Sequence, residues 1–513
     1  MFFSLISGSI SMIRDAVTRE MIGKQREVAP VVAHSAFKPK KGWIIVGKIQ
    51  YDTKIELGSG SGGTIVFRGT YAEREVAVKR VLKQNVQLAT REVKALIESD
   101  SDDNVIRYFD SETDNLFRYL VLELCIGSLS DYVENRKPEI SLTSEEILRQ
   151  ATKGLSHLHS LKIVHRDLKP SNILFSTRGG TVRAVISDFG LCKKIKPDMN
   201  SLSSGSGIVG SMGWMSPEAL KLQSTSFPTD IFSIGLVFYY VLTGGSHPYG
   251  EHYQRSSNIV EGKYSLIGLK TAESRRLISL ALTHSPISRP KASEILSDPF
   301  FWENKERLDF FCEASDRFVG EDFKSLLSKR IMKNGKKIKQ HVKTNWTNEL
   351  CDELKNYVQT ENDKFHPYTE WSLRDLIRLI RNLKHHYWDL PDSVRSSIGE
   401  NINKLDEYFT GRFPHLLLHV YEAMEWCSDE PAFQHYYSDE IKTRMESERR
   451  QAMYTTGESY TKKVRPDSGM PTAPQIPKKS QHAKAPVHPK YRTSEIMSTP
   501  RKDSGSIEKE NLP

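Results

Sequence analysis

The sequence predicts an α+β protein, in which a strand-rich N-terminal region is followed by a longer helical region and then by an all-α domain. Short β-branched and apolar runs in the N-terminal region are typical of strands in a small sheet. These runs lie at residues 44–46, 64–67, 76–79 and 119–122. From residue 148 onward, apolar residues recur at intervals of three and four, which indicates helices. A second pattern of this kind covers residues 373–387.

One octapeptide after the first helical pattern carries the residue types that phosphoryl transfer requires. It reads His-Arg-Asp-Leu-Lys-Pro-Ser-Asn at residues 165–172, and Asp-Phe-Gly follows at residues 188–190. Asp167 can accept the proton of a substrate hydroxyl, whereas Asn172 and Asp188 can hold Mg²⁺ against the phosphates of ATP. These motifs resemble those of the protein kinase family, so we expect a two-lobed protein kinase fold over residues 44–301.

The strand-rich region carries the residues expected to bind the phosphates of ATP. Gly58, Gly60 and Gly63 form a G-x-G-x-x-G pattern, in which backbone N–H groups can approach phosphate oxygens without a side chain between them. Any Gly/Ser turn can imitate this pattern, but Lys79 follows Gly63 by sixteen residues within Val-Ala-Val-Lys. In this family such a lysine holds the α- and β-phosphates.

A carboxylate on the next predicted helix, residues 90–97, should hold Lys79 in place. We choose Glu92 for this role, and Glu98 is the competing carboxylate. Glu123 and Cys125 follow the last strand and resemble the hinge of a kinase, whose backbone groups bond the adenine edge of ATP.

The catalytic loop and the segment after it indicate the acceptor and the mode of regulation. By resemblance to the family, Lys169 points to serine or threonine as the phosphate acceptor. A serine-rich run then lies between Asp-Phe-Gly and Ser-Pro-Glu, which stands where kinases have Ala-Pro-Glu. We expect phosphorylation in this run, because a phosphate there can pair with Arg166 and order the loop; a plain flexible loop is the alternative. The candidate serines are Ser201, Ser203, Ser204 and Ser206.

Residues 302–437 continue without a Pro/Gly-rich linker, so we expect this all-α region to pack directly on the helical lobe. Ser372 and Asp375 match the S-x-x-D pattern that starts a helix. The apolar stripe of this helix is expected to be buried. Its polar side gathers basic and amide groups at helical spacing, namely Arg374, Arg378, Arg381, Asn382, His385 and His386. Such a face can bind RNA phosphate and donate a proton, and an ordinary solvated face is the alternative.

Several motifs in this region resemble the kinase-extension nuclease domain of the inositol-requiring-enzyme family and of ribonuclease L. They are Tyr368, Arg374-Asp375-Leu376, Arg381-Asn382, Lys384-His385-His386-Tyr387, Leu390-Pro391 and Arg412-Phe413-Pro414-His415-Leu416-Leu417. The resemblance covers residues 44–437. It implies that Tyr368 helps to activate the 2′-hydroxyl of RNA, that Arg381 and Asn382 position the phosphate, and that His386 is the general acid.

Leu383 departs from the pattern of this family, whose members usually have lysine at that position. Loss of a positive charge beside the site would slow cleavage or change the choice of RNA. If this is so, Leu383→Lys should raise the cleavage rate.

The remaining segments carry no motif. At 513 residues the chain has room for two to four domains. We expect residues 1–43 to be a flexible basic leader and residues 438–513 a disordered basic tail, because apolar residues are too sparse in the tail to offset the entropy of ordering. Five scattered cysteines without C-x-x-C spacing indicate neither a disulfide partner nor a zinc site, and they suit a reducing compartment.

The resemblance implies a bifunctional serine/threonine kinase and endoribonuclease that uses ATP and Mg²⁺. Its partners would be a second copy of the chain in a homodimer or higher oligomer, itself as phosphorylation substrate, and stem-loop RNA but no DNA. The net charge of +9 suits a phosphate-bearing partner, although a basic tail alone can produce it. The resemblance covers only the cytosolic half of the membrane-bound members, which implies a cytoplasmic chain, or one at the cytosolic face of the endoplasmic reticulum (ER) if luminal and membrane parts exist elsewhere.

Two alternatives remain open. In the first, the nucleotide pocket is a dimerisation switch without phosphotransfer to other proteins, and the intact Lys79, Asp167 and Asp188 speak against it. In the second, the protein is a signalling kinase whose residues 302–437 form an inactive interaction module. Only Leu383 favours this second alternative.

Overall fold

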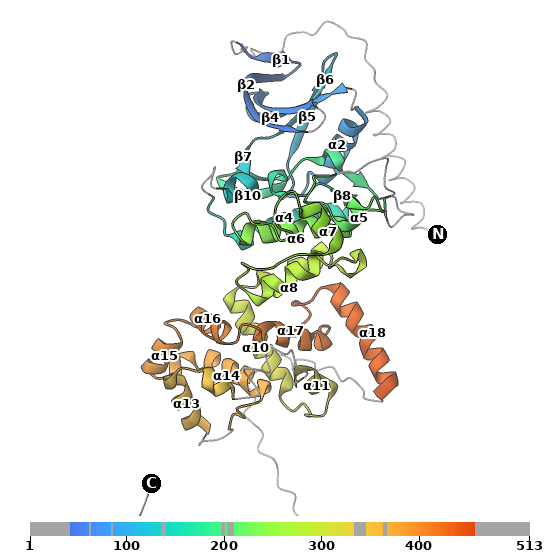
Figure 1. Ribbon diagram of the computed structural model, residues 1–513. Coiled ribbons are helices and arrows are strands. Elements are labelled where there is room, and N and C mark those ends of the chain that lie inside the picture. Colours follow the sequence, from blue (N-terminus) through green and yellow to red (C-terminus); the bar gives the residue numbers. More distant parts are fainter. Residues whose placement is uncertain are drawn as a thin grey trace, which may run out of the picture. The chain divides into compact units, whose positions relative to one another are not determined.

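The computed structural model describes residues 42–60, 63–83, 86–134, 140–195, 201–202, 210–332, 345–362 and 367–456. Figure 1 shows the strands of an N-terminal lobe in blue, a helical lobe in green, and a third group of helices from yellow to red. The predicted leader lies almost wholly outside the described residues, as does the predicted tail beyond residue 456. Within the described ranges, no helix combines the length and the apolar character needed to cross a bilayer.

The N-terminal lobe is a six-stranded antiparallel sheet with one helix, α2 (Val86–Ser99), beside it. In spatial order the strands are β1 (Ile44–Val46), β2 (Ile49–Gly60), β3 (Thr64–Tyr71), β4 (Arg74–Leu82), β6 (Phe117–Glu123) and β5 (Tyr108–Thr113). Alternate residues of a strand face opposite sides of a sheet. Val76 and Val78 accordingly pack in a small core with Tyr51, while Ala77 and Leu120 join the main core.

The helical lobe is built around α6 (Phe227–Leu242), which is buried along most of its length. The predicted helix before the catalytic loop is α4 (Ser144–Ser160), and its apolar stripe is buried as expected. Short strands flank the catalytic loop: β7 (Cys125–Ser128), β9 (Ile173–Arg178) and β10 (Thr181–Ile186) form one sheet, and β8 (Ile163–Val164) and β11 (Lys193–Lys194) another. The remaining elements are α3 (Leu129–Val133), η3 (Pro170–Asn172), η4 (Phe189–Leu191), α5 (Pro217–Leu220), α7 (Arg255–Glu261), α8 (Ala272–Ala281), η5 (Pro286–Ser288), α9 (Ala292–Leu296) and η6 (Pro299–Phe301).

The third group of helices forms an all-α domain around an aromatic-rich core. Phe310 lies in this core with Trp302 at 5.0 Å and Tyr436 at 5.0 Å between ring centroids. The elements are α10 (Asn304–Phe318), α11 (Leu326–Met332), η7 (Trp346–Glu349), α13 (Asp352–Asn362), α14 (Leu373–His385), η8 (Tyr387–Asp389), α15 (Asp392–Ile398), α16 (Ile402–Arg412), α17 (Leu416–Met424), η9 (Glu425–Cys427) and α18 (Asp439–Thr456).

Helix α14 begins where the sequence predicts it. The Oγ of Ser372 accepts a hydrogen bond from the backbone N–H of Asp375 at 3.3 Å, which satisfies one of the free donors at the start of the helix. The carboxylate of Asp375 accepts from the backbone N–H of Thr369 at 3.0 Å. This bond ties the preceding loop, which carries Tyr368, to the first turn of the helix.

The all-α domain packs directly on the helical lobe, as expected from the missing linker. Arg276 of α8 pairs with Asp298, at the end of the helical lobe, at 2.7 Å. The same guanidinium lies 3.3 Å from Glu422 of α17 and 5.5 Å from the ring centroid of Tyr421. One side chain therefore holds both domains.

The expected start of the disordered tail is wrong, because residues 439–456 form the helix α18. Ile441 and Met445 lie four residues apart and are buried in the core of the all-α domain. Further along the helix, Arg449 donates to the backbone oxygen of Trp426 at 2.5 Å and pairs with Asp429 at 2.7 Å. Eight of its 18 residues are charged and few are apolar, so composition alone does not reveal the buried ones.

The anchoring of α18 predicts the effect of shortening Met445. This side chain is 2 % exposed, so Met445→Ala is expected to lower the free energy of unfolding of the all-α domain by about 2–5 kcal/mol. Met453→Ala on the same helix is the matched control, since Met453 is 57 % exposed and a surface change alters stability by less than about 0.5 kcal/mol. Chemical denaturation followed by fluorescence measures both, and equal losses would mean that α18 is not anchored through Met445.

Candidate active sites

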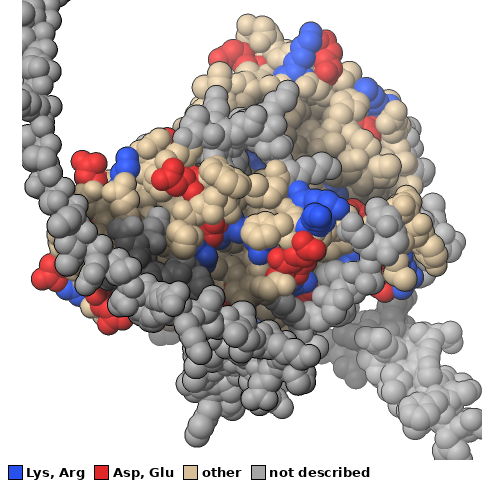
Figure 2. All heavy atoms as spheres, turned by 90° about the horizontal axis from the view of Figure 1, so that it is seen from below, with Lys and Arg blue, Asp and Glu red and all other residues tan. Residues whose placement is uncertain are grey.

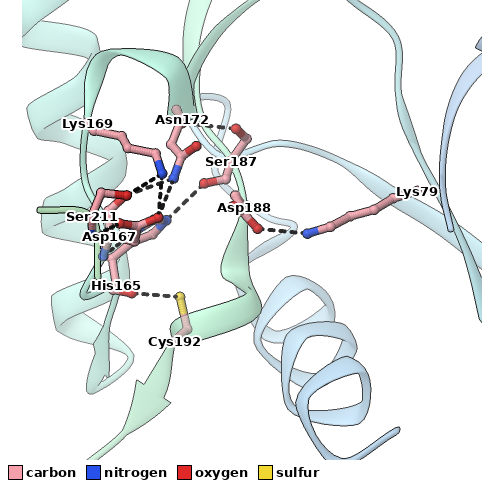
Figure 3. A network of polar contacts seen from close by, with 9 residues as sticks. All are labelled: Lys79, His165, Asp167, Lys169, Asn172, Ser187, Asp188, Cys192 and Ser211. Carbon is pink, nitrogen blue, oxygen red and sulfur yellow. Dashed lines mark hydrogen bonds and ion pairs between the residues drawn. The ribbon is translucent and has the colours of Figure 1, made fainter. Parts of the chain in front are cut away.

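The first site lies between the N-terminal and helical lobes and begins with a buried lysine. The Nζ of Lys79 lies 2.6 Å from Glu92 Oε1 and 2.7 Å from Asp188 Oδ1, and Figure 3 shows Lys79 reaching toward Asp188. Glu98 instead pairs with Lys194 at 2.6 Å. Of the two carboxylates considered for Lys79, the structure therefore brings Glu92 into contact.

The charges in this cluster stabilise one another. Burial by itself lowers the pKa of Lys79, but the carboxylates of Glu92 and Asp188 outweigh it and raise that pKa above its ordinary value. Burial raises the pKa of Asp188, but the Lys79 ammonium outweighs it and lowers that pKa to about 2. Lys79 and Asp188 are therefore both charged at neutral pH.

The catalytic loop gathers around Asp167. Lys169 Nζ lies 2.9 Å from Asp167 Oδ2, and Asn172 Nδ2 donates to the same oxygen at 3.1 Å. The other oxygen, Oδ1, accepts from the backbone N–H of Ser211 at 2.8 Å, and Lys169 also donates to Ser211 Oγ at 2.5 Å. Figure 3 shows these groups converging. Ser211 carries no motif of its own, and sequence analysis missed it.

Asp230 on α6 fixes the backbone of the catalytic loop. Its two carboxylate oxygens each accept a backbone N–H bond at 2.8 Å, one from His165 and one from Arg166. Arg166 and Asp188 both have positive φ values, 68° and 62°, which non-glycine residues adopt only when the surroundings enforce it. The contact between Asp230 and the catalytic loop spans more than 60 residues of the chain, so it becomes visible only in the structure.

The residues expected to bind adenine, Glu123 and Cys125, lie where β6 ends and β7 begins. Cys125 begins β7, where it pairs in register with Ser176. The carboxylate of Glu123 accepts hydrogen bonds from Ser176 and Arg183 and thereby fixes the end of β6. Burial raises the pKa of the Cys125 thiol to about 12, so the thiol stays protonated at neutral pH.

The three predicted glycines lie on the β2–β3 hairpin, with Gly58 and Gly60 paired to Val66 and Thr64. Gly63 has a φ of 76°, which a residue with a side chain rarely adopts.

The activation segment is described only in part. Ser201 is half-buried, and the adjacent Leu202 bridges to Thr225 through two backbone hydrogen bonds of 2.7 and 3.0 Å. Ser203, Ser204 and Ser206 lie outside the described residues. The Ser-Pro-Glu motif closes the segment, and its Glu218 pairs with the buried Arg289 at 2.7 Å.

The donors at the cleft fit a divalent cation bound together with phosphate. Among the described residues, no group of three or more His, Cys, Asp or Glu side chains is placed to hold a metal ion alone. Asp188 and Asn172 offer a carboxylate and an amide oxygen, the hard donors that magnesium prefers, and magnesium commonly completes its shell with substrate phosphates and water.

The second site lies on α14. Asn382 Nδ2 donates to the hydroxyl oxygen of Tyr368 at 2.8 Å, and its Oδ1 accepts from Arg381 Nη1 at 3.1 Å. The guanidinium of Arg378 lies over the Tyr368 ring, 4.6 Å from its centroid. The structure thus brings together three of the four residues expected to carry out RNA cleavage.

The fourth residue, His386, stands just beyond the end of the helix. Its backbone N–H donates to the backbone oxygen of Asn382 at 2.9 Å, so His386 caps the last turn of α14. Its Nδ1 lies 3.1 Å from Asp389 Oδ2, and its side chain is 66 % exposed. A carboxylate on Nδ1 orients the imidazole and leaves Nε2 on the other side of the ring. Asp389 was not expected from the sequence.

The prediction of one continuous basic face on α14 is wrong. Arg374 donates to the backbone oxygen of Phe318, at the end of α10, at 2.6 Å. Arg381 pairs with Asp316 of α10 at 2.7 Å, and Lys384 pairs with Asp309 of the same helix. On the face seen in Figure 2, basic and acidic side chains lie interspersed. The helical spacing of the arginines could not reveal carboxylates that lie 65 or more residues away in the chain.

Leu383 belongs to the apolar stripe of α14, which is buried as expected. It is 2 % exposed and packs in the core of the all-α domain, so its side chain does not lie beside the site. A lysine here would have to carry its ammonium out of the core along its aliphatic stem. We therefore no longer expect Leu383→Lys to raise the cleavage rate.

Two domain families match the chain. Residues 51–301 match the protein kinase domain. Residues 307–437 match the ribonuclease 2-5A family. The second match ends immediately before α18, so this helix lies outside both matched regions.

Relatives that contain both regions are long proteins. The chain is 47 % identical to the serine/threonine-protein kinase/endoribonuclease ire-1 of Caenorhabditis elegans, over 79 % of this chain and 42 % of that protein. It is 44 % identical to the serine/threonine-protein kinase/endoribonuclease IRE2 of Homo sapiens, over 78 % and 44 %. It is 39 % identical to the sensor for unfolded proteins in the ER ire1 of Schizosaccharomyces pombe, over 72 % and 37 %. The chain spans less than half the length of each of these relatives.

Proposed function

Because the chain belongs to the family of serine/threonine-protein kinase/endoribonucleases, we propose that it transfers phosphate from ATP to serine or threonine and also cleaves RNA. The observation that carries this proposal is that two separate polar clusters exist on one chain. One joins Lys79 to Glu92 and Asp188, and the other joins Tyr368 to Asn382.

In the kinase domain the described groups divide the work of phosphoryl transfer. Asp167 accepts the proton of the acceptor hydroxyl, and Lys169 offsets negative charge beside it. Lys79, held by Glu92, binds the α- and β-phosphates. A divalent cation held by Asp188 and Asn172, which we propose to be Mg²⁺, would neutralise charge on the transferred phosphoryl group. Gly58, Gly60 and Gly63 cover the phosphates, and the backbone at Glu123 and Cys125 holds adenine.

In the all-α domain the substrate supplies its own nucleophile. The 2′-oxygen of a ribose attacks the adjacent phosphorus, the bond to the 5′-oxygen breaks, and the products are a 2′,3′-cyclic phosphate and a 5′-hydroxyl. Tyr368 assists removal of the 2′-proton, Arg381 and Asn382 hold the phosphate, and His386 protonates the leaving oxygen. Single-stranded loops of stem-loop RNA are the expected targets, since their splayed bases are accessible.

The decisive experiment uses the full chain and a stem-loop RNA. The protein is first incubated with ATP and Mg²⁺, after which EDTA is added together with the RNA. We expect cleavage to persist and to leave 2′,3′-cyclic phosphate ends, because the chemistry above draws only on side chains and the 2′-hydroxyl. RNA that stays intact with the phosphorylated protein would overturn the nuclease assignment and leave the kinase assignment standing.

We also propose that two copies of the chain associate after autophosphorylation, with each copy acting on the other. The candidate acceptors are the activation-segment serines Ser201, Ser203, Ser204 and Ser206, where a phosphate can pair with a cation of the catalytic loop.

Replacing these four serines by alanine is expected to weaken association, because the segment loses the phosphate that orders it. Sedimentation velocity after treatment with ATP and Mg²⁺ compares the variant with the wild type. Replacement of Ser256, Ser257, Ser279 and Ser293, four serines on helices of the same lobe, is the matched control. Unchanged association and full activity in the first variant would mean that the serine run is a plain loop.

We propose that the chain consists of a leader over residues 1–43, a kinase domain over residues 44–301, and a nuclease domain that begins at residue 302 and extends through α18 to residue 456. We further propose that the described domains act in the cytoplasm, at the cytosolic face of the ER. This placement rests on the Schizosaccharomyces pombe relative, which is a sensor for unfolded proteins in the ER.

One observation favours a second candidate function, a signalling kinase whose all-α domain only binds partners. Arg381, the residue proposed to hold the phosphate, already pairs with Asp316 at 2.7 Å. Asp316→Asn distinguishes the two functions. If the arginine serves RNA, its release should keep or raise the cleavage rate, whereas an inactive module would cleave no RNA in either form.

A further inference from the structure

The distribution of tryptophans sets one part of the all-α domain apart. All seven tryptophans of the chain lie within the described residues, and five of them are buried or half-buried. The two exposed ones, Trp371 and Trp388, are 63 % and 72 % exposed and flank the two ends of α14. An exposed tryptophan leaves a large apolar surface in water, so it is most often accounted for by a ligand or a partner.

Trp388 is held rigidly on the turn that follows the proposed general acid. It lies two residues after His386 on η8. The first residue of η8, Tyr387, is 1 % exposed and anchors the turn. The Tyr387 ring meets the Trp388 ring edge-on, at 5.2 Å and 88°. The guanidinium of Arg395 lies 5.8 Å from the Trp388 centroid. The indole is therefore positioned from two sides, yet most of its surface faces solvent.

We propose that Trp388 stacks on the RNA base next to the bond that is cleaved. This inference rests on the proposed nuclease function and adds a binding residue to that site. Aromatic side chains stack on every base, because each base has a π-face, and they give affinity with little dependence on sequence. A single-stranded loop offers unstacked bases of this kind, whereas an A-form helix does not.

The surroundings of Trp388 favour a base over the surface of a second protein. Its exposed neighbours are charged, since Asp389 is 78 % and the side chain of Asp392 89 % exposed. A protein-docking patch would be continuous and apolar. Each of these two carboxylates pairs with a cation, His386 and Arg395 respectively, which reduces their repulsion toward a phosphate chain.

The test compares three variants of the full chain on stem-loop RNA. Trp388→Ala should raise KM by about 5- to 150-fold with kcat nearly unchanged, the range that the loss of one stacked base implies. Trp388→Phe should recover most of this loss, because phenylalanine still stacks. Trp371→Ala, which removes the same residue type at the other end of α14, should leave KM at the wild-type value. Binding of a 2′-O-methyl stem-loop, which lacks the nucleophile, should follow the same order.

Four other outcomes would contradict the inference, and each has a different meaning. An unchanged KM in Trp388→Ala, with the wild type active, would remove Trp388 from the site and leave the nuclease function intact. Loss of self-association in Trp388→Ala, measured by sedimentation, would reassign the residue to an interface between copies. Equal losses in Trp388→Ala and Trp371→Ala would exclude a single stacking position. If the wild type neither binds nor cleaves RNA, the nuclease function itself fails, and the inference with it.

Discussion

Replacing His386 by alanine is expected to lower the rate of RNA cleavage by about 10²–10⁴-fold, the usual contribution of a general acid or base. The leaving 5′-oxygen would then have to depart without a proton. The side chain is 66 % exposed, so its removal should leave the fold intact, and autophosphorylation should continue at the wild-type rate. Single-turnover cleavage of stem-loop RNA by the phosphorylated protein measures the effect.

His385 provides the matched control for this experiment, because it is the adjacent imidazole. Burial together with the charges of Arg381 and Lys384 lowers the pKa of His385. It is therefore held in the neutral form at neutral pH and has no proton to give as an acid. His385→Ala should retain most of the cleavage activity. A His386→Ala protein that cuts as fast as the wild type, or a His385→Ala protein that is silent, would assign the acid to another residue.

Replacing Asp188 by alanine is expected to abolish autophosphorylation. The change removes a proposed metal ligand and also one of the two carboxylates that hold Lys79, since Asp188 Oδ1 lies 2.7 Å from its ammonium. Mass spectrometry of the purified protein after incubation with ATP and Mg²⁺ counts the phosphates added. The wild type should gain phosphate on serine, and the variant none.

The two carboxylates of α2 provide the control for the kinase experiment. Glu98→Ala breaks only a surface pair with Lys194, and exposed pairs contribute less than about 1 kcal/mol, so autophosphorylation should remain. Glu92→Ala releases the buried Lys79 and should reduce it strongly. A wild-type protein that gains no phosphate would contradict the kinase assignment, and equal behaviour of the two glutamate variants would contradict the role of the pair.

The sequence predicted those features that depend on local pattern. The strands at residues 44–46 and 76–79 were found because β-branched residues favour strands, even though the first of these strands is largely exposed, and the start of α14 was found because Ser372 caps it. The partner of Lys79 was found because the kinase motif fixes its chemistry. Much of β2 was missed although Ile55 and Leu57 alternate with polar residues, because the strand runs into the glycine-rich segment that was interpreted as a phosphate-binding turn.

Features that depend on distant residues could not be predicted. Asp316 and Asp309 of α10 neutralise Arg381 and Lys384 of α14, and no spacing within α14 reveals this. Helix α18 was assigned to the tail because apolar residues are sparse there, although its Met445 is buried. The same limit applies to Ser211, which meets Asp167 only once the activation segment has folded back over the loop.

The junction at Arg276 has a consequence for how the two proposed activities are linked in a pair of chains. A flexible linker would absorb any change in the orientation of the kinase lobes, but here a single guanidinium holds Asp298 on one side and Glu422 on the other. We therefore expect the helical lobe and the all-α domain to move together as one body. In the proposed dimer, a change in the angle between the two kinase domains would therefore change the distance between the two proposed RNA-cleavage sites.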